Sequence, residues 1–202
     1  DEAWDFDLEI GDAWLDEGHR FEVVARMVLA DDDGESTRQY LLFNPSLGSL
    51  WVNEYDGDWT LWTSTRIAPD SDPFDVPDGA SIRTGDNRRW RKSEGGTLTL
   101  QQVEGALPWQ ASIGDRIEYA EFEGGSGGAH YEAQRTGNEV EYGLGLTLSA
   151  SEVRVARGEE EAAPKAAPTA KGSKRTGCFI LGIFLIFPAF FALLIGLDRK
   201  ST

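Results

Sequence analysis

The sequence predicts a mainly β protein, built as an antiparallel barrel or a strongly curved antiparallel sheet and followed by a flexible linker and one transmembrane helix. Three observations support this fold class. Short segments rich in aromatic and β-branched residues alternate apolar with polar positions. Turn-forming Gly, Asn, Asp and Pro residues separate these segments. A long run of uncharged residues follows near the end of the chain.

The clearest strand signal is the segment 21–29, in which every odd position is apolar, as expected for a strand that buries one face. Asp56 and Gly57 are typical of a two-residue hairpin turn, because both turn positions need positive φ. Strands this short and evenly spaced favour a barrel or a curved sheet. The other expected strands are residues 38–43, 50–55, 59–65, 97–103, 116–123, 129–136, 138–142 and 151–155.

A weak internal repeat indicates two similar halves within the folded region, which we place at residues 1–157. The repeated element is Ile-Gly-Asp, which occurs at residues 10–12 and 113–115 and is each time followed by a strand that opens near a histidine. The segment between the halves is polar and rich in proline and glycine, which favours a long loop. The expected bounds are 6–66 and 97–156 for the halves and 67–96 for the loop.

The end of the chain differs in character from the rest. Residues 158–176 have no large apolar side chain, so they cannot offset the entropy of ordering and should form a flexible linker. The 21 residues from Gly177 to Leu197 carry no charge. At about 1.5 Å of rise per residue their helix is roughly 31 Å long, which matches a bilayer core. We therefore expect a transmembrane helix over residues 177–197 and a short tail over 198–202.

Two residues within the expected span have alternative roles. Pro188 lies near its middle, where membrane helices tolerate a proline kink. Cys178 lies at its start, as a plain interfacial cysteine or as an acylation site. More basic residues precede the span than follow it, which by the positive-inside rule places the acidic domain in the cytoplasm.

The net charge of −16 is unevenly distributed. Residues 171–202 have five basic side chains and one acidic one, a balance of +4, which leaves −20 for residues 1–170. A domain this acidic is not expected to bind nucleic acid, because phosphate binding needs clustered Lys and Arg. The single cysteine excludes a disulfide framework and a multi-thiolate zinc site within the chain. We expect no cofactor or metal, since His19 and His130 lack metal-spaced partners and are interpreted as surface or turn residues.

Two sets of residues are candidates for a binding surface. The aromatic set could form a platform for a peptide or ligand, although cross-strand packing in the core is the alternative. The basic set could contact lipid headgroups or an acidic partner, and a solvated loop is its alternative. The sets are Trp51, Tyr55, Trp59 and Trp62, and Arg88, Arg89 and Arg91.

Several stretches of the sequence form one recognisable pattern, and its most specific part is residues 39–45 with Gly48, Trp51, Val52, Glu54, Tyr55, Gly57 and Trp59. Residues 8–12, 103–109, 113–114, 139–142 and Gly145 fit the same pattern. Over residues 6–155 the chain thus resembles a bacterial family known as domain of unknown function 4178. It implies a β-rich domain that often precedes a membrane span and accompanies genes of membrane maintenance or polyamine-synthase-like proteins. It supplies no catalytic residues.

Together these observations predict a membrane-anchored, non-catalytic recognition or scaffold module linked to bacterial membrane maintenance. It would be a single-pass protein of the bacterial inner membrane, in contact with the lipid bilayer and with another membrane-associated protein. The alternative is an enzyme or sensor domain acting on a small cationic, polyamine-like ligand. An enzyme requires carboxylates such as Glu54 or Asp58 to converge with a histidine in a closed pocket, whereas a sensor would use the negative field of the domain.

Overall fold

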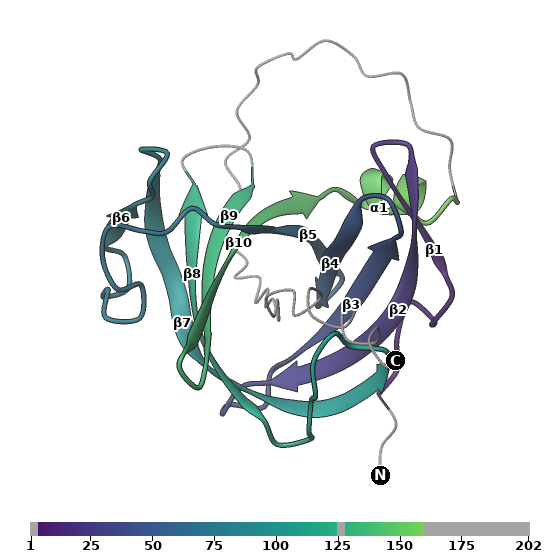
Figure 1. The fold of residues 1–202 in the computed structure, drawn as a ribbon, viewed down its shortest axis with the longest axis horizontal. Coiled ribbons are helices and arrows are strands. Elements are labelled where there is room, and N and C mark those ends of the chain that lie inside the picture. Colours follow the sequence, from purple (N-terminus) through teal and green to yellow (C-terminus); the bar gives the residue numbers. More distant parts are fainter. Residues whose placement is uncertain (1–3, 125–127, 160–202) are drawn as a thin grey trace, which may run out of the picture.

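Eight antiparallel strands close into a barrel in the computed structural model, which describes residues 4–124 and 128–159 (Figure 1). Around the barrel the strands follow the order β2-β3-β4-β5-β10-β9-β8-β7, and β7 pairs with β2 to close it. The prediction of a mainly β fold with a barrel-like antiparallel sheet is therefore confirmed. The strands are β1 (Ala13–Asp16), β2 (His19–Ala30), β3 (Ser36–Asn44), β4 (Gly48–Tyr55), β5 (Asp58–Thr65), β6 (Ser81–Arg83), β7 (Arg89–Gly105), β8 (Arg116–Gly124), β9 (Ala129–Thr136) and β10 (Glu139–Leu148).

The strands form two sets with the same internal order. In each set a short strand, β1 or β6, pairs with the first strand of a four-stranded meander, β2–β5 or β7–β10. The first strands of the two meanders pair with each other, and so do the last strands, β5 and β10. Asp56 and Gly57 have φ values of 49° and 81°, which confirms the predicted hairpin turn between β4 and β5.

The two Ile-Gly-Asp segments form the same local turn. Gly11 and Gly114 have φ values of 96° and 95°, and each glycine N–H donates to a strand carbonyl, that of Val23 or Leu100, at 2.8 Å. In both turns the aspartate carboxylate accepts a hydrogen bond from the N–H three residues earlier. One turn precedes β1 and the other follows β7, so they do not occupy equivalent places in the two strand sets.

The segment 67–96 is not a continuous loop, because β6 and the first part of β7 lie within it. Ile82 and Trp90 are paired across these strands and buried, with exposed serine or arginine residues on either side of each. The Trp90 indole N–H donates to the Thr84 hydroxyl at 3.0 Å. A buried residue between exposed polar or charged ones is the alternation expected of a strand. The proline and glycine content of the segment, on which the loop prediction was based, did not indicate these strands.

Residues 151–155 form a helix rather than the expected strand. Helix α1 (Ala150–Ala156) begins at Ser149, whose hydroxyl accepts from the N–H of Glu152, while the Glu152 carboxylate accepts from the N–H of Ser149. This reciprocal capping box satisfies N–H groups that a helix start leaves unpaired. Val153 and Ala156 turn one face of the helix toward the barrel.

Three apolar clusters hold the fold together. The first contains side chains that face the barrel interior, among them Met27, Trp51 and Trp62. The second covers the outer face of β2–β5, where the N-terminal segment and α1 pack on the sheet. The third covers the outer face of β7–β10 beneath the segment that precedes β6. Because both faces of the wall are covered, much of each strand is buried on two sides.

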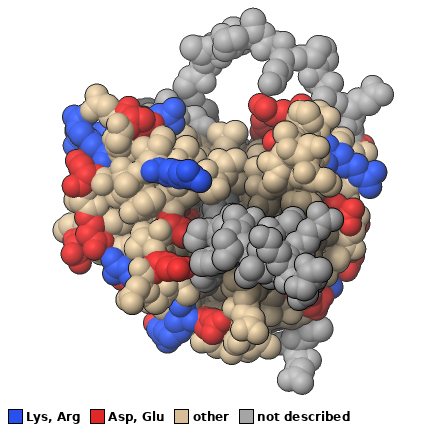
Figure 2. Space-filling view, viewed as in Figure 1, with Lys and Arg blue, Asp and Glu red and all other residues tan. Residues whose placement is uncertain are grey.

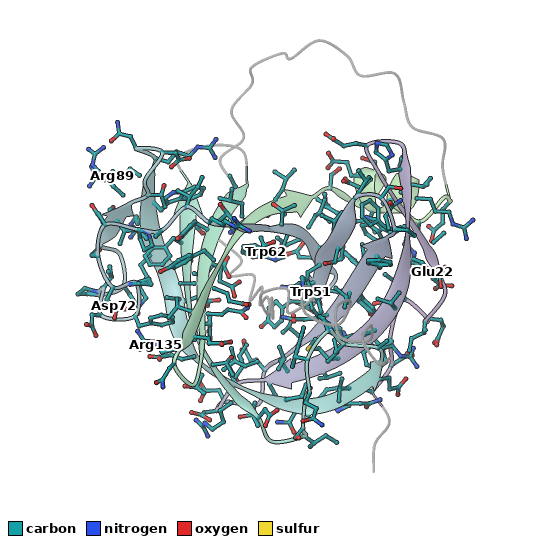
Figure 3. All side chains as sticks on the ribbon, in the orientation of Figure 1. Glu22, Trp51, Trp62, Asp72, Arg89 and Arg135 are labelled. Carbon is teal, nitrogen blue, oxygen red and sulfur yellow. The ribbon has the colours of Figure 1, made fainter. Side chains whose placement is uncertain are left out.

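Trp62 and Gly145 fix one side of the barrel wall. They are directly paired between β5 and β10, and Trp62 points into the barrel (Figure 3). A Cβ on Gly145 would lie 2.6 Å from the Trp62 ring, so the ring packs flat on the bare backbone. The neighbour of Gly145 on β9 is His130, whose ring centroid lies 6.0 Å from that of Trp62. This register places His130 on the interior face of β9.

Three predicted segments lie outside the described residues: the linker beyond Glu159, the span 177–197 and the tail 198–202. Within residues 4–124 and 128–159, no helix has both the length and the apolar character needed to cross a bilayer.

We predict that Gly145→Ala lowers the free energy of unfolding by about 1–3 kcal/mol, because the added methyl group overlaps the Trp62 ring. The measurement is urea unfolding of the full chain in detergent micelles, followed by tryptophan fluorescence. Gly85→Ala is the matched control, since its Cβ would find its nearest atoms at an ordinary 3.8 Å. Equal urea midpoints for both variants would contradict the packing described above.

Candidate functional site

Three glutamates form a row across the interior face of β7, β8 and β9. Glu94 is paired with Glu121, and Glu121 with Glu132, so each carboxyl group has another on the neighbouring strand. Directly paired residues have Cβ atoms about 4.5–5.5 Å apart. Glu132 lies two residues from His130 on β9 and therefore shares its inward face. We call Glu94, Glu121 and Glu132 the carboxyl row.

The carboxyl row is shielded from water. Glu121 and Glu132 are only 2% and 1% exposed, and Glu94 is half-buried with its Oε1 fully covered. Burial, and then the charge of Glu121, raise the pKa of Glu94 to about 8. The same two causes hold the pKa of Glu132 well above its ordinary value. At neutral pH Glu94 therefore keeps a proton that an exposed carboxyl group would have lost.

His130 links the carboxyl row to the neighbouring strand β10. Its Nε2 lies 2.8 Å from the Thr147 hydroxyl, and its Nδ1 lies 2.9 Å from Oε1 of Glu121. The imidazole is 9% exposed, and both of its ring nitrogens lie close to polar side chains of the barrel wall. The imidazole therefore lies between the Thr147 hydroxyl and the carboxyl group of Glu121.

A small hollow opens at the end of the barrel formed by β9 and β10. It is lined by Gln134, Thr136, Glu139 and Glu141, all on inward-facing positions of the two strands. Gln134 is 3% exposed, and its amide N–H donates to Glu132 at 2.5 Å. The amide oxygen of Gln134 is buried without a hydrogen-bond partner among the described residues. Gln134 thus connects the hollow with the carboxyl row and leaves one free acceptor between them.

Other polar groups inside the barrel lack partners as well. Gln39 is fully buried, and within the described part of the chain neither its amide nitrogen nor its oxygen has a hydrogen-bond partner. The Thr60 hydroxyl is also buried without a hydrogen-bond partner among the described residues. Their strands, β3 and β5, lie opposite β9 and β7 in the strand order of the barrel. Buried polar groups are normally hydrogen-bonded, so these residues indicate an interior suited to a polar ligand.

Comparison with known proteins gives the chain a family. The family model described as Domain of unknown function (DUF4178) matches residues 9–150. The chain belongs to the DUF4178 family. The matched region runs from the turn before β1 to the first residue of α1, so it contains the whole barrel, the carboxyl row and the hollow. No curated protein and no solved structure matches the chain.

The DUF4178 barrel separates the aromatic residues that the sequence placed on one candidate surface. Trp51 and Trp62 are paired on the interior face, where Trp51 also packs against Trp109 (Figure 3). Trp59 lies on the outer face, stacked on Trp14 and on Tyr40 with ring centroids 5.8 Å apart in both pairs. Tyr55 lies at the end of β4, and its hydroxyl donates to the Glu35 carboxylate at 2.6 Å.

The basic candidates lie away from the barrel interior. Arg89 and Arg91 are exposed at the start of β7, and Arg88 just before it pairs with Asp86 at 3.1 Å. Arg91 donates to the Gly79 carbonyl. Figure 2 shows basic and acidic side chains interspersed over the face in view.

The prediction for His130 as a surface or turn residue is wrong, whereas His19 is exposed as expected. Glu54 was considered as a partner for a histidine, but it lies on the outer face and pairs with Arg38 at 2.6 Å. Asp58 is exposed at the start of β5. The glutamate that meets His130 is Glu121, which the sequence analysis did not identify.

A usable signal for the carboxyl row was present in the sequence. In residues 120–123 of β8 and in β9, acidic or amide residues alternate with mostly apolar ones, and such a pattern normally marks a solvated face. Here the apolar positions pack outward under the segment before β6, so the polar face is the interior. Among the described residues, no three His, Cys, Asp or Glu side chains are arranged to bind one metal ion.

We predict that the DUF4178 domain loses stability as the pH rises from about 5 to about 9. Because the pKa of Glu94 is about 8 in the folded chain and near 4.5 when exposed, the folded state binds more protons across this range. Its stabilising effect is complete below pH 4.5 and is lost as the pH rises through the folded value. Urea midpoints of the full chain at several pH values measure the slope.

Glu94→Gln should flatten this pH dependence, because it removes the proton that the folded state retains. The matched control is Glu22→Gln, which removes one exposed carboxylate from β2 (Figure 3). A slope that is the same in the wild type and in both variants would show that Glu94 titrates normally.

Proposed function

We propose that the DUF4178 domain is a recognition module that binds a small organic cation inside its barrel. The observation that carries this proposal is the carboxyl row of Glu94, Glu121 and Glu132, three directly paired acidic side chains on the interior face. Eight-stranded barrels of this size can hold one small ligand, with wall side chains that determine its chemistry.

Charge supports a cation as the ligand. Burying adjacent carboxylates costs free energy, because each loses hydration and repels the next. Protonation relieves part of that cost, which is why the pKa values of Glu94 and Glu132 are raised. An ammonium group placed among them would relieve it further through charge-assisted hydrogen bonds. The free acceptor of Gln134 favours a ligand that carries N–H donors.

The contacts of His130 support recognition rather than catalysis. Both ring nitrogens of His130 already contact groups of the barrel wall, Thr147 and Glu121. A histidine held in this way orients a carboxylate that a ligand would contact. The polyamine-like ligand of the sensor hypothesis fits this interior, and it is the alternative that the geometry favours over an enzyme.

The uncharged segment 177–197 supports attachment of the domain to a membrane. In this proposal the barrel lies on the cytoplasmic side of the bacterial inner membrane, tethered through the linker 158–176. A tethered barrel would keep ligand recognition close to a membrane-associated partner. Such a module would serve membrane maintenance by reporting the concentration of a small cation.

Organic ammonium ions should raise the melting temperature of the full chain in detergent micelles. The panel is butylammonium, putrescine and spermidine chloride, compared with sodium chloride at equal ionic strength and with butanediol. A ligand at one hundred times its Kd stabilises a folded protein by about 2.7 kcal/mol. If no ammonium ion raises the melting temperature beyond sodium chloride, the proposed function is wrong.

Glu132→Gln separates recognition from folding. The amide has nearly the same shape and carries no charge, so the unliganded variant should be at least as stable as the wild type. It should nevertheless lose most of the stabilisation by ammonium ions. Glu22→Gln, with the same change in net charge, should keep it. Retained stabilisation in Glu132→Gln would place the ligand outside the carboxyl row.

Membrane attachment is tested by fractionation of cells that produce the full chain. Detergent should release the chain from the membrane fraction, and high salt should not, because the expected span 177–197 is held by apolar contact. Release by salt alone would indicate peripheral attachment and contradict the anchor.

A further inference from the structure

We infer that the ligand of the barrel is an elongated dication, which lies along β9 and β10 with one charge at the carboxyl row and the other in the hollow at Glu139 and Glu141. This inference rests on the proposed function and adds the shape and the charge of the ligand. Its basis is that the carboxyl row and the glutamates of the hollow lie on either side of a buried acceptor, the amide oxygen of Gln134.

The register of the two strands determines the spacing. Glu132 is paired with Gly143, and Gln134 with Glu141, so Glu141 lies one inward position closer to the barrel end than the carboxyl row. Glu139 lies one inward position further, opposite Thr136. Inward positions along an antiparallel strand are about 7 Å apart. The two acidic groups are thus separated by roughly 7–14 Å along the wall, a span that a linear diamine or polyamine can cover.

Gln134 is the second, independent observation that points to a ligand. It is almost fully buried, its N–H donates to Glu132, and its oxygen remains an acceptor without a partner among the described residues. An oxygen in this position can accept an N–H from a ligand that extends from the carboxyl row to the hollow. Leaving such an acceptor buried without a partner costs about 1–3 kcal/mol, which a hydrogen bond from a ligand N–H would offset.

The charges around the hollow favour a cation there. Glu139 is exposed and Glu141 is half-buried, so the glutamates of the hollow are more solvated than those of the carboxyl row. Arg135, between Gln134 and Thr136 in the chain, points to the outer face (Figure 3). There it pairs with Asp72 and Glu118, at 3.0 Å in each case. It therefore does not neutralise the inner side of the wall.

The test compares two ligands with the same carbon chain, putrescine with two ammonium groups and butylamine with one. Calorimetric titration of the full chain in detergent micelles should give a Kd for putrescine at least about tenfold lower, the value of one added charge-assisted hydrogen bond. In Glu139→Gln/Glu141→Gln the ratio of the two Kd values should fall toward one. In Glu22→Gln it should stay as in the wild type.

The outcomes separate this inference from the proposed function. Equal affinity for putrescine and butylamine would overturn the inference and leave a monovalent cation in the carboxyl row. A preference for putrescine that persists in the double variant would overturn the assignment of Glu139 and Glu141. Binding of neither amine, together with an unchanged melting temperature for every ammonium ion, would overturn the proposed function itself. Circular dichroism of each variant verifies that the β fold is retained.

Discussion

Closure of the barrel is the constraint on which the rest of the structure depends. Once β7 pairs with β2, every strand has one face inside the barrel and one outside it. Successive residues of a strand must therefore face the interior and the exterior in turn. Ala120 and Phe122 of β8 and Tyr131 of β9 pack in the outer cluster beneath the segment before β6. Glu121, Glu132 and Gln134, which alternate with them, must then face the interior. The buried acidic wall follows directly from that choice of faces.

The same closure explains why the interior residues act together. Trp62 lies flat on Gly145, which brings His130 beside it, and His130 in turn contacts Glu121. One side of the interior is therefore packed and aromatic, while the other holds carboxyl groups that burial keeps partly protonated. A ligand that carries positive charge on an apolar chain matches both sides. This match, rather than the overall acidity of the domain, is what supports a cation as ligand.

The barrel architecture was predictable from sequence because it depends on local signals. Alternation in the segment 21–29 and the Asp56-Gly57 turn determine strands and hairpins without reference to the rest of the chain. The helix α1 was missed although Ser149 and Glu152 have the spacing of a capping box. The site was missed for a different reason. Whether the glutamates of β8 and β9 face water or the interior depends on what covers the other face, and that cover comes from distant residues.

The most direct test of the account is a titration of the carboxyl carbons of Glu94 and Glu132 by carbon NMR, on the full chain with and without putrescine. The account predicts that both groups titrate above the ordinary glutamate range without ligand, with Glu94 near 8. Putrescine should lower both pKa values, since a bound ammonium group favours the ionised form. Ordinary pKa values that putrescine does not change would contradict a buried carboxyl row that binds a cation.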